Sequence, residues 1–427
     1  MTLNVLPNVG RFLWISVFFM VLGVSTVVSA QEQVAVPAKL TLTDALQLAM
    51  KNNPILQRDR QNLAIANASV RQAKLLPNPE LDVSSQSYPL FESKPGSFWN
   101  NQEFTLLAGQ TIETASKRSK RTRVAQQEFL ATGSDVLNAE REIRLEVKGR
   151  YFAAVLAKTQ LSLAQEILKQ FDEVIRLNEA RFKQGELSGL EMNRIRAERL
   201  RFYSDVLDSN LQLANSKTAL LEVLGAGDLT GKFDIVETLA AAVQPVQLSE
   251  LQQLALQSRP DLVAAQQRLE RNRREVEVQK ADAMPNVTPS FGYKRDFGVN
   301  TAAFGITLPI PLFNRNQGGI TKASAQLEQQ RYEVTRSLLA VRREVQQGYQ
   351  TLESQAERLR ALEKEYVPAA KKAHEIAQES YRLGALDLIG LLDAERVYRE
   401  TLRAYNVALF DYKIAVFQLE ASVGKEF

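Results

Sequence analysis

The amino-acid sequence predicts a mainly α-helical protein with a small β-sheet part and an internal two-fold repeat. Three observations predict this fold class. Short motifs return in the same order about 200 positions later, two long stretches carry the spacing of packed helices, and the segments between helical stretches alternate apolar and polar residues. We therefore expect long coiled-coil helical hairpins combined with four strands per chain.

The repeat appears as four pairs of motifs. The pairs are Leu48–Pro54 with Leu254–Pro260, Leu76–Asn78 with Met284–Asn286, Arg181–Gly185 with Ser380–Gly384, and Leu224–Gly225 with Val423–Gly424. Such a repeat is one structural unit used twice. We expect a first copy over 31–240, with a β-hairpin near 79–111 and a helical hairpin over 116–225. The second copy, 241–427, should have its β-hairpin near 286–311 and its helical hairpin over 318–423.

Residues 1–30 have the features of an export signal. An apolar run from Phe12 to Val28 follows Arg11 and ends in the small residues Val28-Ser29-Ala30. An N-terminal membrane anchor is the alternative, but basic stop-transfer residues do not follow the run. No other stretch reaches the roughly 20 apolar residues of a spanning helix. We therefore expect a cleaved signal peptide and an exported mature chain.

The composition excludes several classes of function. The chain has no cysteine, which excludes disulfides, thiol chemistry and a lipid on an N-terminal cysteine. Its one histidine, His374, excludes a His-rich zinc site, and we expect it to be solvated on a helix face. The net charge of +4 is too small to indicate nucleic-acid binding, and no phosphate-binding glycine loop is present. We expect no enzyme activity, no cofactor and no metal site.

The long helical stretches run from about 116 to 184 and from about 319 to 383. Both are rich in strong helix formers, and Pro368 is the one proline within them. Because an interior proline costs about 3 kcal/mol, it predicts a kink or an irregular turn near Val367. Both stretches have a 4-3 seam typical of coiled coils. The seams are Ala157, Leu161, Ala164, Leu168, Phe171, Ile175, Asn178 and Phe182, and Leu359, Leu362, Tyr366, Ala369, Ala373, Ile376, Ser380 and Leu383.

Short breaks divide the other helices. Gly185–Gly189 and Gly384–Asp387 each separate a long helix from a second one, which predicts a helical hairpin in each copy. Upstream, 43–76 and 249–284 predict paired helices that restart at Pro54 and Pro260, because proline suits the first helical turn.

Four segments alternate with period two, as strands do. In the second copy, 301–310 places Phe304 and Ile306 on one face with Ala302, Leu308 and Ile310, and the neighbouring strand over 286–296 does the same with Val287, Phe291 and Tyr293. The first copy has Leu81 and Val83, then Phe104, Leu106 and Ala108, with Tyr88, Phe91, Phe98 and Trp99 in the loop between.

Two hairpins cannot bury such apolar faces alone. In an exported chain, lipid favours strands that are apolar on the outside and polar on the inside, provided that the sheet closes into a barrel. Four strands are too few for a useful bore, whereas three chains would supply twelve. The alternative is a periplasmic coiled-coil scaffold without a pore, whose sheet packs against a helix.

The order of these motifs resembles the TolC-like outer membrane efflux proteins, or outer membrane factors. The likeness covers essentially the whole mature chain. It is carried by the Asn53-Pro54 opening, the strand entries Pro77–Leu81 and Pro285-Asn286, the strand exit Pro309–Phe313 and the hairpin tip from Gly384 to Glu395. The segment Gln110–Glu113 followed by Lys117-Arg118 resembles the CzcC-like heavy-metal branch, with Thr114-Ala115-Ser116 where that branch has glycines.

The resemblance implies a passive homotrimeric duct: a twelve-stranded barrel in the outer membrane continued by a helical tunnel across the periplasm. The implied partners are a periplasmic adaptor (membrane fusion) protein, an inner membrane RND-type pump and outer membrane lipid. Heavy-metal cations are one candidate cargo, and drugs or proteins secreted by a type I system are the alternative. The duct would open by a shear of helices biased by the adaptor.

The resemblance also implies a periplasmic aperture near the helical tips. Asp393 matches an aspartate that narrows this aperture, and a ring of three would favour cations. Glu191 and Tyr381 match positions whose hydrogen bonds between helices hold the tip closed, and a second family aspartate would fall at Gly390. The alternative is that Asp393 and Glu191 are ordinary solvated charges. The candidate adaptor contacts, with simple helical turns as the alternative, are Gly185, Leu187, Gly384 and Leu386.

Overall fold

The computed structural model describes residues 36–86, 102–240 and 247–426. The predicted signal peptide and the predicted aromatic loop residues Tyr88, Phe91, Phe98 and Trp99 lie outside these ranges. All of the described residues belong to one structural unit.

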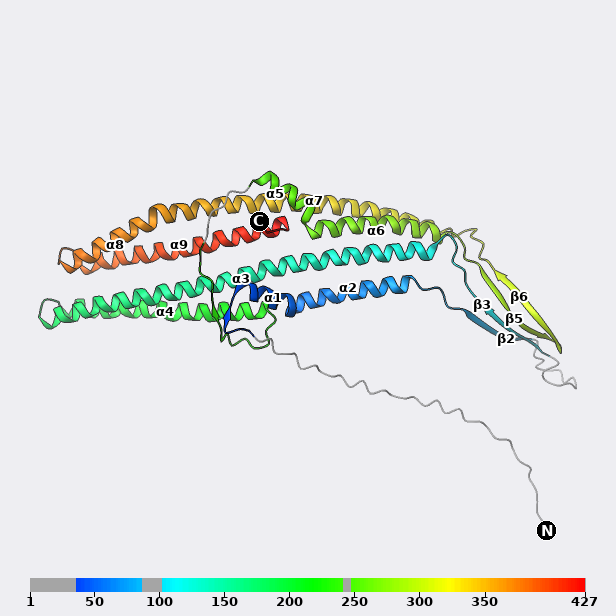
Figure 1. Ribbon diagram of the computed structural model, residues 1–427, viewed down its shortest axis with the longest axis horizontal. Coiled ribbons are helices and arrows are strands. Elements are labelled where there is room, and N and C mark those ends of the chain that lie inside the picture. The colour runs from blue at the N-terminus through cyan, green and yellow to red at the C-terminus, as the bar shows by residue number, and fades with distance from the viewer. Residues whose placement is uncertain (1–35, 87–101, 241–246, 427) are drawn as a thin grey trace, which may run out of the picture. The chain divides into compact units, whose positions relative to one another are not determined.

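Apart from the short strands of the first series, two helices, two strands and a helical hairpin follow one another twice along the chain (Figure 1). The first series is β1 (Lys39–Leu40), α1 (Leu42–Asn52), α2 (Pro54–Ala73), β2 (Glu80–Gln86), β3 (Glu103–Gly109), α3 (Lys117–Lys183), α4 (Gly189–Val223) and β4 (Asp234–Ile235). The second is α5 (Leu248–Ser258), α6 (Pro260–Asp282), β5 (Thr288–Asp296), β6 (Val299–Thr307), α7 (Gln317–Ala361), a π-helical turn (Leu362–Tyr366), α8 (Val367–Arg382) and α9 (Leu388–Val423). The mainly α fold with a small β part is confirmed, while the boundaries of the two copies stay a prediction.

The longest helix, α3, packs against helices from both halves of the chain. It contacts α2 and α4 from its own half and α6 and α9 from the other half. The other extensive helix–helix interfaces are those of α7 with α6 and α9, and of α8 with α9. Figure 1 shows the resulting hairpins, α3 with α4 and α8 with α9. Among the described residues, no helix combines the length and the apolar character needed to cross a membrane.

The ends of α4 and α9 press against the corners where α1 meets α2 and α5 meets α6. At the first corner, the Asn53 amide donates to Val223 O at 2.8 Å, while its Oδ1 accepts from the first backbone N–H groups of α2. Gly225 follows with φ of +71°, and a Cβ there would lie 2.5 Å from Asn52 O. The repeated Gly424 has φ of +82° beside Ser258 O. The glycine of this repeated motif is therefore a packing requirement.

The seam of the first long helix is observed. Ala157, Ala164, Phe171 and Asn178 are buried at seven-residue intervals along α3, although Phe182 at the end is exposed. The irregular turn predicted near Val367 is also confirmed, as the π-helical turn that ends at Tyr366.

The second predicted seam is wrong beyond that turn. The buried residues of α8 are Ala370, His374, Ala377 and Tyr381, each one position after the predicted Ala369, Ala373, Ile376 and Ser380. A π-helical turn holds one extra residue within the helix, so it rotates everything after it by one position. Ile376, predicted to be in the seam, is 58 % exposed.

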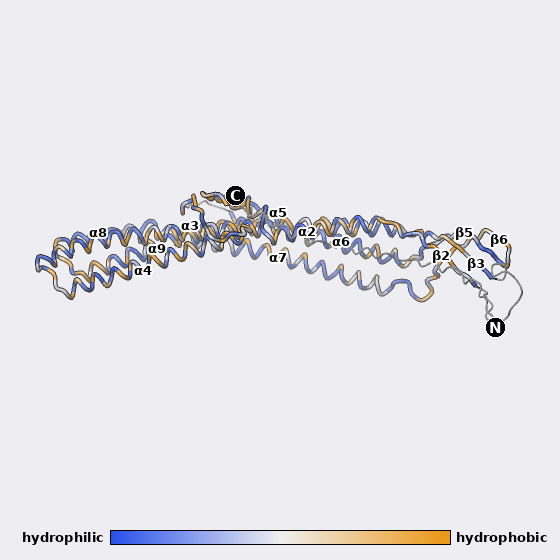
Figure 2. The backbone as a smooth tube through the Cα atoms, turned by 90° about the horizontal axis from the view of Figure 1, so that it is seen from below, coloured by the Kyte–Doolittle hydropathy of each residue, from blue (hydrophilic) through white to orange (hydrophobic). Residues whose placement is uncertain are grey.

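The sheet is antiparallel with strand order β2-β3-β5-β6, so two hairpins are joined through β3 and β5. The register places Phe291 opposite both Ala108 and Phe304, and the two phenylalanine rings are 5.0 Å apart. All predicted apolar positions within the strands thus share one face, and Figure 2 shows the mixed apolar and hydrophilic colouring along them. Phe304 is 80 % exposed and Ile306 76 %. The last strand ends at Thr307 and not at Ile310, because Pro309 has no N–H for a ladder.

The segment that resembles the heavy-metal branch connects β3 to α3. Thr114 Oγ1 donates to Pro285 O at 2.6 Å, and the buried Lys117 Nζ donates to Met284 O at 2.6 Å. Ala115 and Ser116 have φ of 52° and 56°, the left-handed region that favours glycine. The segment therefore ties the first half of the chain to the second, and it forms this turn without glycine.

Candidate channel aperture and helical tips

The two helical tips share one apolar core. It contains Ile167 and Phe171 of α3, Ile195 and Phe202 of α4, Ala377 and Tyr381 of α8, and Leu388 and Leu391 of α9, with Leu187 and Leu386 packed against it. Gly185 and Gly384 have φ of +78° and +76°, and a Cβ at either would meet open space. The candidate adaptor contacts are thus two similar turns, each with a leucine held by the same core.

Tyr381 connects α8 to α3 inside this core. Its hydroxyl donates to Asn178 Oδ1 at 2.6 Å, and the Asn178 amide donates to Val174 O at 2.8 Å. Both side chains are buried, and burial raises the pKa of Tyr381, which keeps the hydroxyl protonated as a donor. The coiled-coil seam predicted from the sequence includes Asn178, but no sequence pattern indicates that it accepts a hydrogen bond from Tyr381.

Glu191 is bonded within its own turn. Its carboxylate accepts from Ser188 N at 3.1 Å and from Ser188 Oγ at 2.9 Å, and Ser188 Oγ accepts from Glu191 N. This capping box begins α4, and the hydrogen bonds from Ser188 hold the pKa of Glu191 below its usual range. Within the described chain the hydrogen bonds of Glu191 serve the tip turn, so its contact with another helix stays a prediction.

Asp393 is exposed and is paired with a neighbouring cation. Its carboxylate lies 2.7 Å from Arg396, which also contacts Glu400 at 3.2 Å. Asp393 and Arg396 line a groove of about 210 Å³ between α4 and α9. The other lining residues are Glu198, Arg201, Phe202, Ile389, Leu392 and Arg399. At Gly390, where a second family aspartate is expected from the sequence, a Cβ would lie 2.6 Å from a Leu386 methyl group.

His374 is not solvated, contrary to the prediction from sequence. The extra residue of the π-helical turn rotates it into the space between α8 and α9, where it is 5 % exposed and stacks on Tyr398 with ring centroids 4.8 Å apart. Its Nδ1 lies 3.1 Å from Glu395 Oε2, but the groups are not aligned for a hydrogen bond. Burial lowers the pKa of His374 and raises the pKa of Glu395. Both groups are therefore held toward their neutral forms.

This burial predicts a pH dependence of stability that the variant His374→Gln lacks. The folded protein keeps His374 neutral, whereas the unfolded chain binds a proton near pH 6.5. Stability should therefore be lost as the pH falls through 6.5, by about 1.4 kcal/mol for each unit by which the folded pKa lies lower. NMR of the one histidine in the intact protein measures this pKa directly, and a midpoint at or above 6.5 would contradict the expectation.

The contribution of Glu395 to stability changes with pH in the opposite direction to that of His374, so it needs its own control. Its folded pKa is raised, so its contribution is complete in acid and is lost as the pH rises through the folded pKa. The variant Glu395→Gln removes this second titration and isolates the effect of His374.

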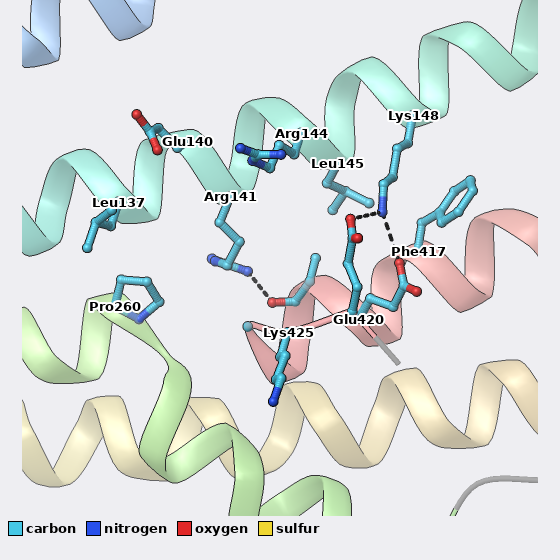
Figure 3. Close-up of a pocket in the computed structure, with 13 residues that line it drawn as sticks. Leu137, Glu140, Arg141, Arg144, Leu145, Lys148, Pro260, Phe417, Glu420 and Lys425 are labelled. Carbon is cyan, nitrogen blue, oxygen red and sulfur yellow. Dashed lines mark hydrogen bonds and ion pairs between the residues drawn. The ribbon is translucent and has the colours of Figure 1, made fainter. Parts of the chain in front are cut away.

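A cavity of about 360 Å³ lies away from the tips, where α3 meets α9 and the start of α6. Figure 3 shows Arg141 and Lys148 reaching from α3 toward α9. Lys148 contacts Glu420 at 3.0 Å and Glu426 at 2.6 Å, while Arg141 donates to Ala421 O at 2.6 Å. Lys148 and Arg141 are therefore already paired with carboxylates and a carbonyl oxygen. Because these contacts join α3 of the first half to the end of α9 in the second, the residues around the cavity hold the two halves together. In the described ranges, no three His, Cys, Asp or Glu side chains are grouped to hold a metal ion.

Comparison with known proteins places the chain in a family. The profile of the family described as "Outer membrane efflux protein" matches residues 45–226 and 251–425. The cobalt-zinc-cadmium resistance protein CzcC of Cupriavidus metallidurans is 24 % identical over 88 % of each chain. The alkaline protease secretion protein AprF of Pseudomonas aeruginosa is 24 % identical over 90 % of this chain and 84 % of that protein.

A solved structure of CusC has a similar fold, with a TM-score of 0.76, 20 % identity, and coverage of 90 % of this chain and 92 % of that one. The resemblance inferred from the ordered motifs is thus confirmed. Because the family profile matches two segments that together cover most of the chain, this protein belongs to the outer membrane efflux protein family.

Proposed function

We propose that this protein is the outer membrane channel of a tripartite efflux system, a passive trimeric duct from the periplasm to the exterior. One observation carries the proposal. A single chain joins two helical hairpins, whose tips share a core, to a four-stranded sheet whose apolar face is exposed. A duct needs such a sheet in lipid and such helices in water.

The sheet edges support the proposed trimer. In the described chain, β2 and β6 each pair on one side only, with β3 and β5 respectively. Pairing β6 of one chain with β2 of the next would satisfy both edges, and three chains would close a twelve-stranded barrel. The exposed Phe304 and Ile306 would then face lipid.

The proposed partners are a periplasmic adaptor and an inner membrane RND-type pump. The turns at Gly185 and Gly384, with Leu187 and Leu386, are the proposed adaptor contacts. The pump would supply the energy and most of the specificity, so the channel itself needs no catalytic residue. Opening would be a shear of α8 against α3 that breaks the bond between Tyr381 and Asn178.

The proposed cargo is heavy-metal cations. The similarity to CzcC supports it, since that relative's name specifies cobalt, zinc and cadmium. The comparable similarity to AprF supports the second candidate, secretion of a protein. An aperture ring of Asp393 would favour cations, but Arg396 beside each copy would weaken the preference.

Single-channel conductance of the purified protein in planar bilayers tests the channel and its aperture together. We expect Asp393→Asn to lower the cation-to-anion permeability ratio and Arg396→Gln to raise it. Each change should be roughly fivefold or less, because two unit charges 4 Å apart in water interact by about 1 kcal/mol. An unchanged permeability ratio in both variants would exclude Asp393 and Arg396 from the aperture, whereas a failure to form pores would contradict the channel itself.

A further inference from the structure

The four connectors between the sheet and the helices carry a strong excess of positive charge. They comprise residues 71–79, 110–123, 283–287 and 308–323, which we call the junction. The junction contains nine lysines and arginines but one acidic residue, Glu113. Glu113 is already paired with Arg121 at 2.6 Å. The other cations therefore have no carboxylate within the junction.

Most of these cations are available to an external partner. The exposed ones are Arg71, Lys74, Arg118, Arg123, Arg315 and Lys322. In the described part of the chain, the side chains of Arg118, Lys120 and Arg123 contact no carboxylate. Lys117 differs, because it is buried and donates to Met284 O and Asn286 Oδ1.

The same connectors expose large apolar side chains. Phe313 is 91 % exposed, and six further residues are more than half exposed. These are Leu75, Leu76, Ile112, Met284, Ile310 and Leu312. They lie between the ends of the strands and the ends of the helices, next to the exposed apolar face of the sheet. Each of the four connectors contributes at least one of them.

Hydrogen bonds hold the connectors together as one surface. Gln110 Nε2 donates to Pro77 O at 3.0 Å, and Arg121 donates to Leu75 O at 3.2 Å. Thr114 joins the third connector through Pro285 O, and Asn316 Nδ2 in the fourth donates to Gln279 O, just before the third, at 2.8 Å. The four connectors therefore lie together where the sheet meets the helices (Figure 1), and this region carries both the exposed apolar side chains and the exposed cations.

We propose that the junction binds anionic phospholipids of the periplasmic leaflet of the outer membrane. Its apolar side chains enter the acyl region, and its lysines and arginines reach the phosphate groups while their stems lie along the apolar surface. A free phosphate would not need the apolar groups, and a neutral lipid would not need the cations. The sequence has no cysteine for an attached lipid, so bound lipids are the anchor that this surface supplies.

The proposal rests on the placement of the sheet in the outer membrane, but not on the cargo or the aperture. Equilibrium binding of a fluorescent phosphatidylglycerol to the intact detergent-solubilised protein tests it, with fluorescent phosphatidylcholine as the neutral probe. The test variant is Arg118→Gln, Lys120→Gln, Arg123→Gln. The matched control is Lys169→Gln, Arg342→Gln, Lys372→Gln, which removes three exposed cations outside the junction.

We expect the junction variant to bind phosphatidylglycerol ten- to a hundredfold more weakly, because a lysine or arginine near an anionic surface contributes about fivefold. Phosphatidylcholine binding and the control variant should change less than twofold. Equal losses in both triple variants, or no loss in either, would overturn the proposal. So would competition by millimolar inorganic phosphate, which would indicate a phosphate site.

Leu312→Ser with Phe313→Ser tests the apolar half. We expect this variant to weaken both probes about equally, and unchanged binding would overturn the role of lipid. Circular dichroism and conductance keep the two proposals separate. A protein that binds lipid but forms no pore would contradict the channel alone, and a conducting pore without lipid preference would contradict the junction alone.

Discussion

Replacing Gly225 with alanine is expected to destabilise the protein by about 3 kcal/mol or more, because the new Cβ is both strained and obstructed. Gly225 has a φ of +71°, where a side chain costs about 1–2 kcal/mol. The Cβ would also lie 2.5 Å from Asn52 O and 2.8 Å from the carbonyl carbon. Both obstructing atoms are backbone at the end of α1, so the corner between α1 and α2 must move.

Gly185→Ala is the matched control. Gly185 also ends a long helix with positive φ, +78°, but no atom lies within 4 Å of its ideal Cβ. It should therefore cost only the conformational part, about 1–2 kcal/mol. Thermal unfolding of the solubilised protein, followed by circular dichroism, measures the difference. Equal losses of stability for the two variants would show that the backbone at Asn52 moves away from the new Cβ at little cost in free energy.

Arg259→Leu should cost about 2–4 kcal/mol, because it leaves two partly buried carboxylates and a backbone carbonyl without their cation. The guanidinium is 3 % exposed, and it contacts Asp261 at 2.6 Å and Glu344 at 2.8 Å. It also donates to Ser422 O at 3.0 Å, which holds the end of α9 at the corner of α5 and α6. The two carboxylates are about a third exposed, so we place the cost below that of a fully buried pair.

The neighbouring arginine provides the control for this variant. Arg343 lies 3.8 Å from the same Glu344 carboxylate, but its side chain is 65 % exposed. Arg343→Leu should therefore change the stability by less than about 1 kcal/mol. If both variants lose the same stability, then Glu344 is the important group and the burial of Arg259 is not.

The sequence allowed the architecture to be predicted because its signals are local. Heptad spacing, alternation and turn glycines each act over a few residues, and their return in a second copy supports each assignment. Gly225 and Gly424 are an example, since their recurrence pointed to a shared structural need that the corners explain.

The details that escaped prediction depend on partners distant in sequence. Nothing near His374 indicates burial, because one extra residue in the π-helical turn decides which side of α8 faces α9. The heptad pattern continues through that turn in the sequence, with Ala369, Ala373 and Ile376 in register, so the pattern gave the wrong face. Arg399 is similar, because its partner Asp205, 3.1 Å away, is on α4.

Arg396 was within reach of sequence reasoning. It lies three positions after Asp393, a spacing at which helical side chains meet. The resemblance drew the prediction to the aspartate, and the resemblance carried no information on its neighbours.

The π-helical turn also makes the two hairpins of one chain unequal. The inserted residue lies in the second long helix and has no counterpart in α3. From Tyr366 to the tip, the buried face of the α8–α9 hairpin is therefore rotated by one residue position relative to that of the α3–α4 hairpin. A ring of three such chains would hold six hairpins of two alternating kinds, and its symmetry would be three-fold and not six-fold. Each hairpin would then have two different flanks, one met by its own chain and one by a neighbour. The three hairpins of one kind could then move together, without the same movement of the other three, and the three-fold symmetry would be kept.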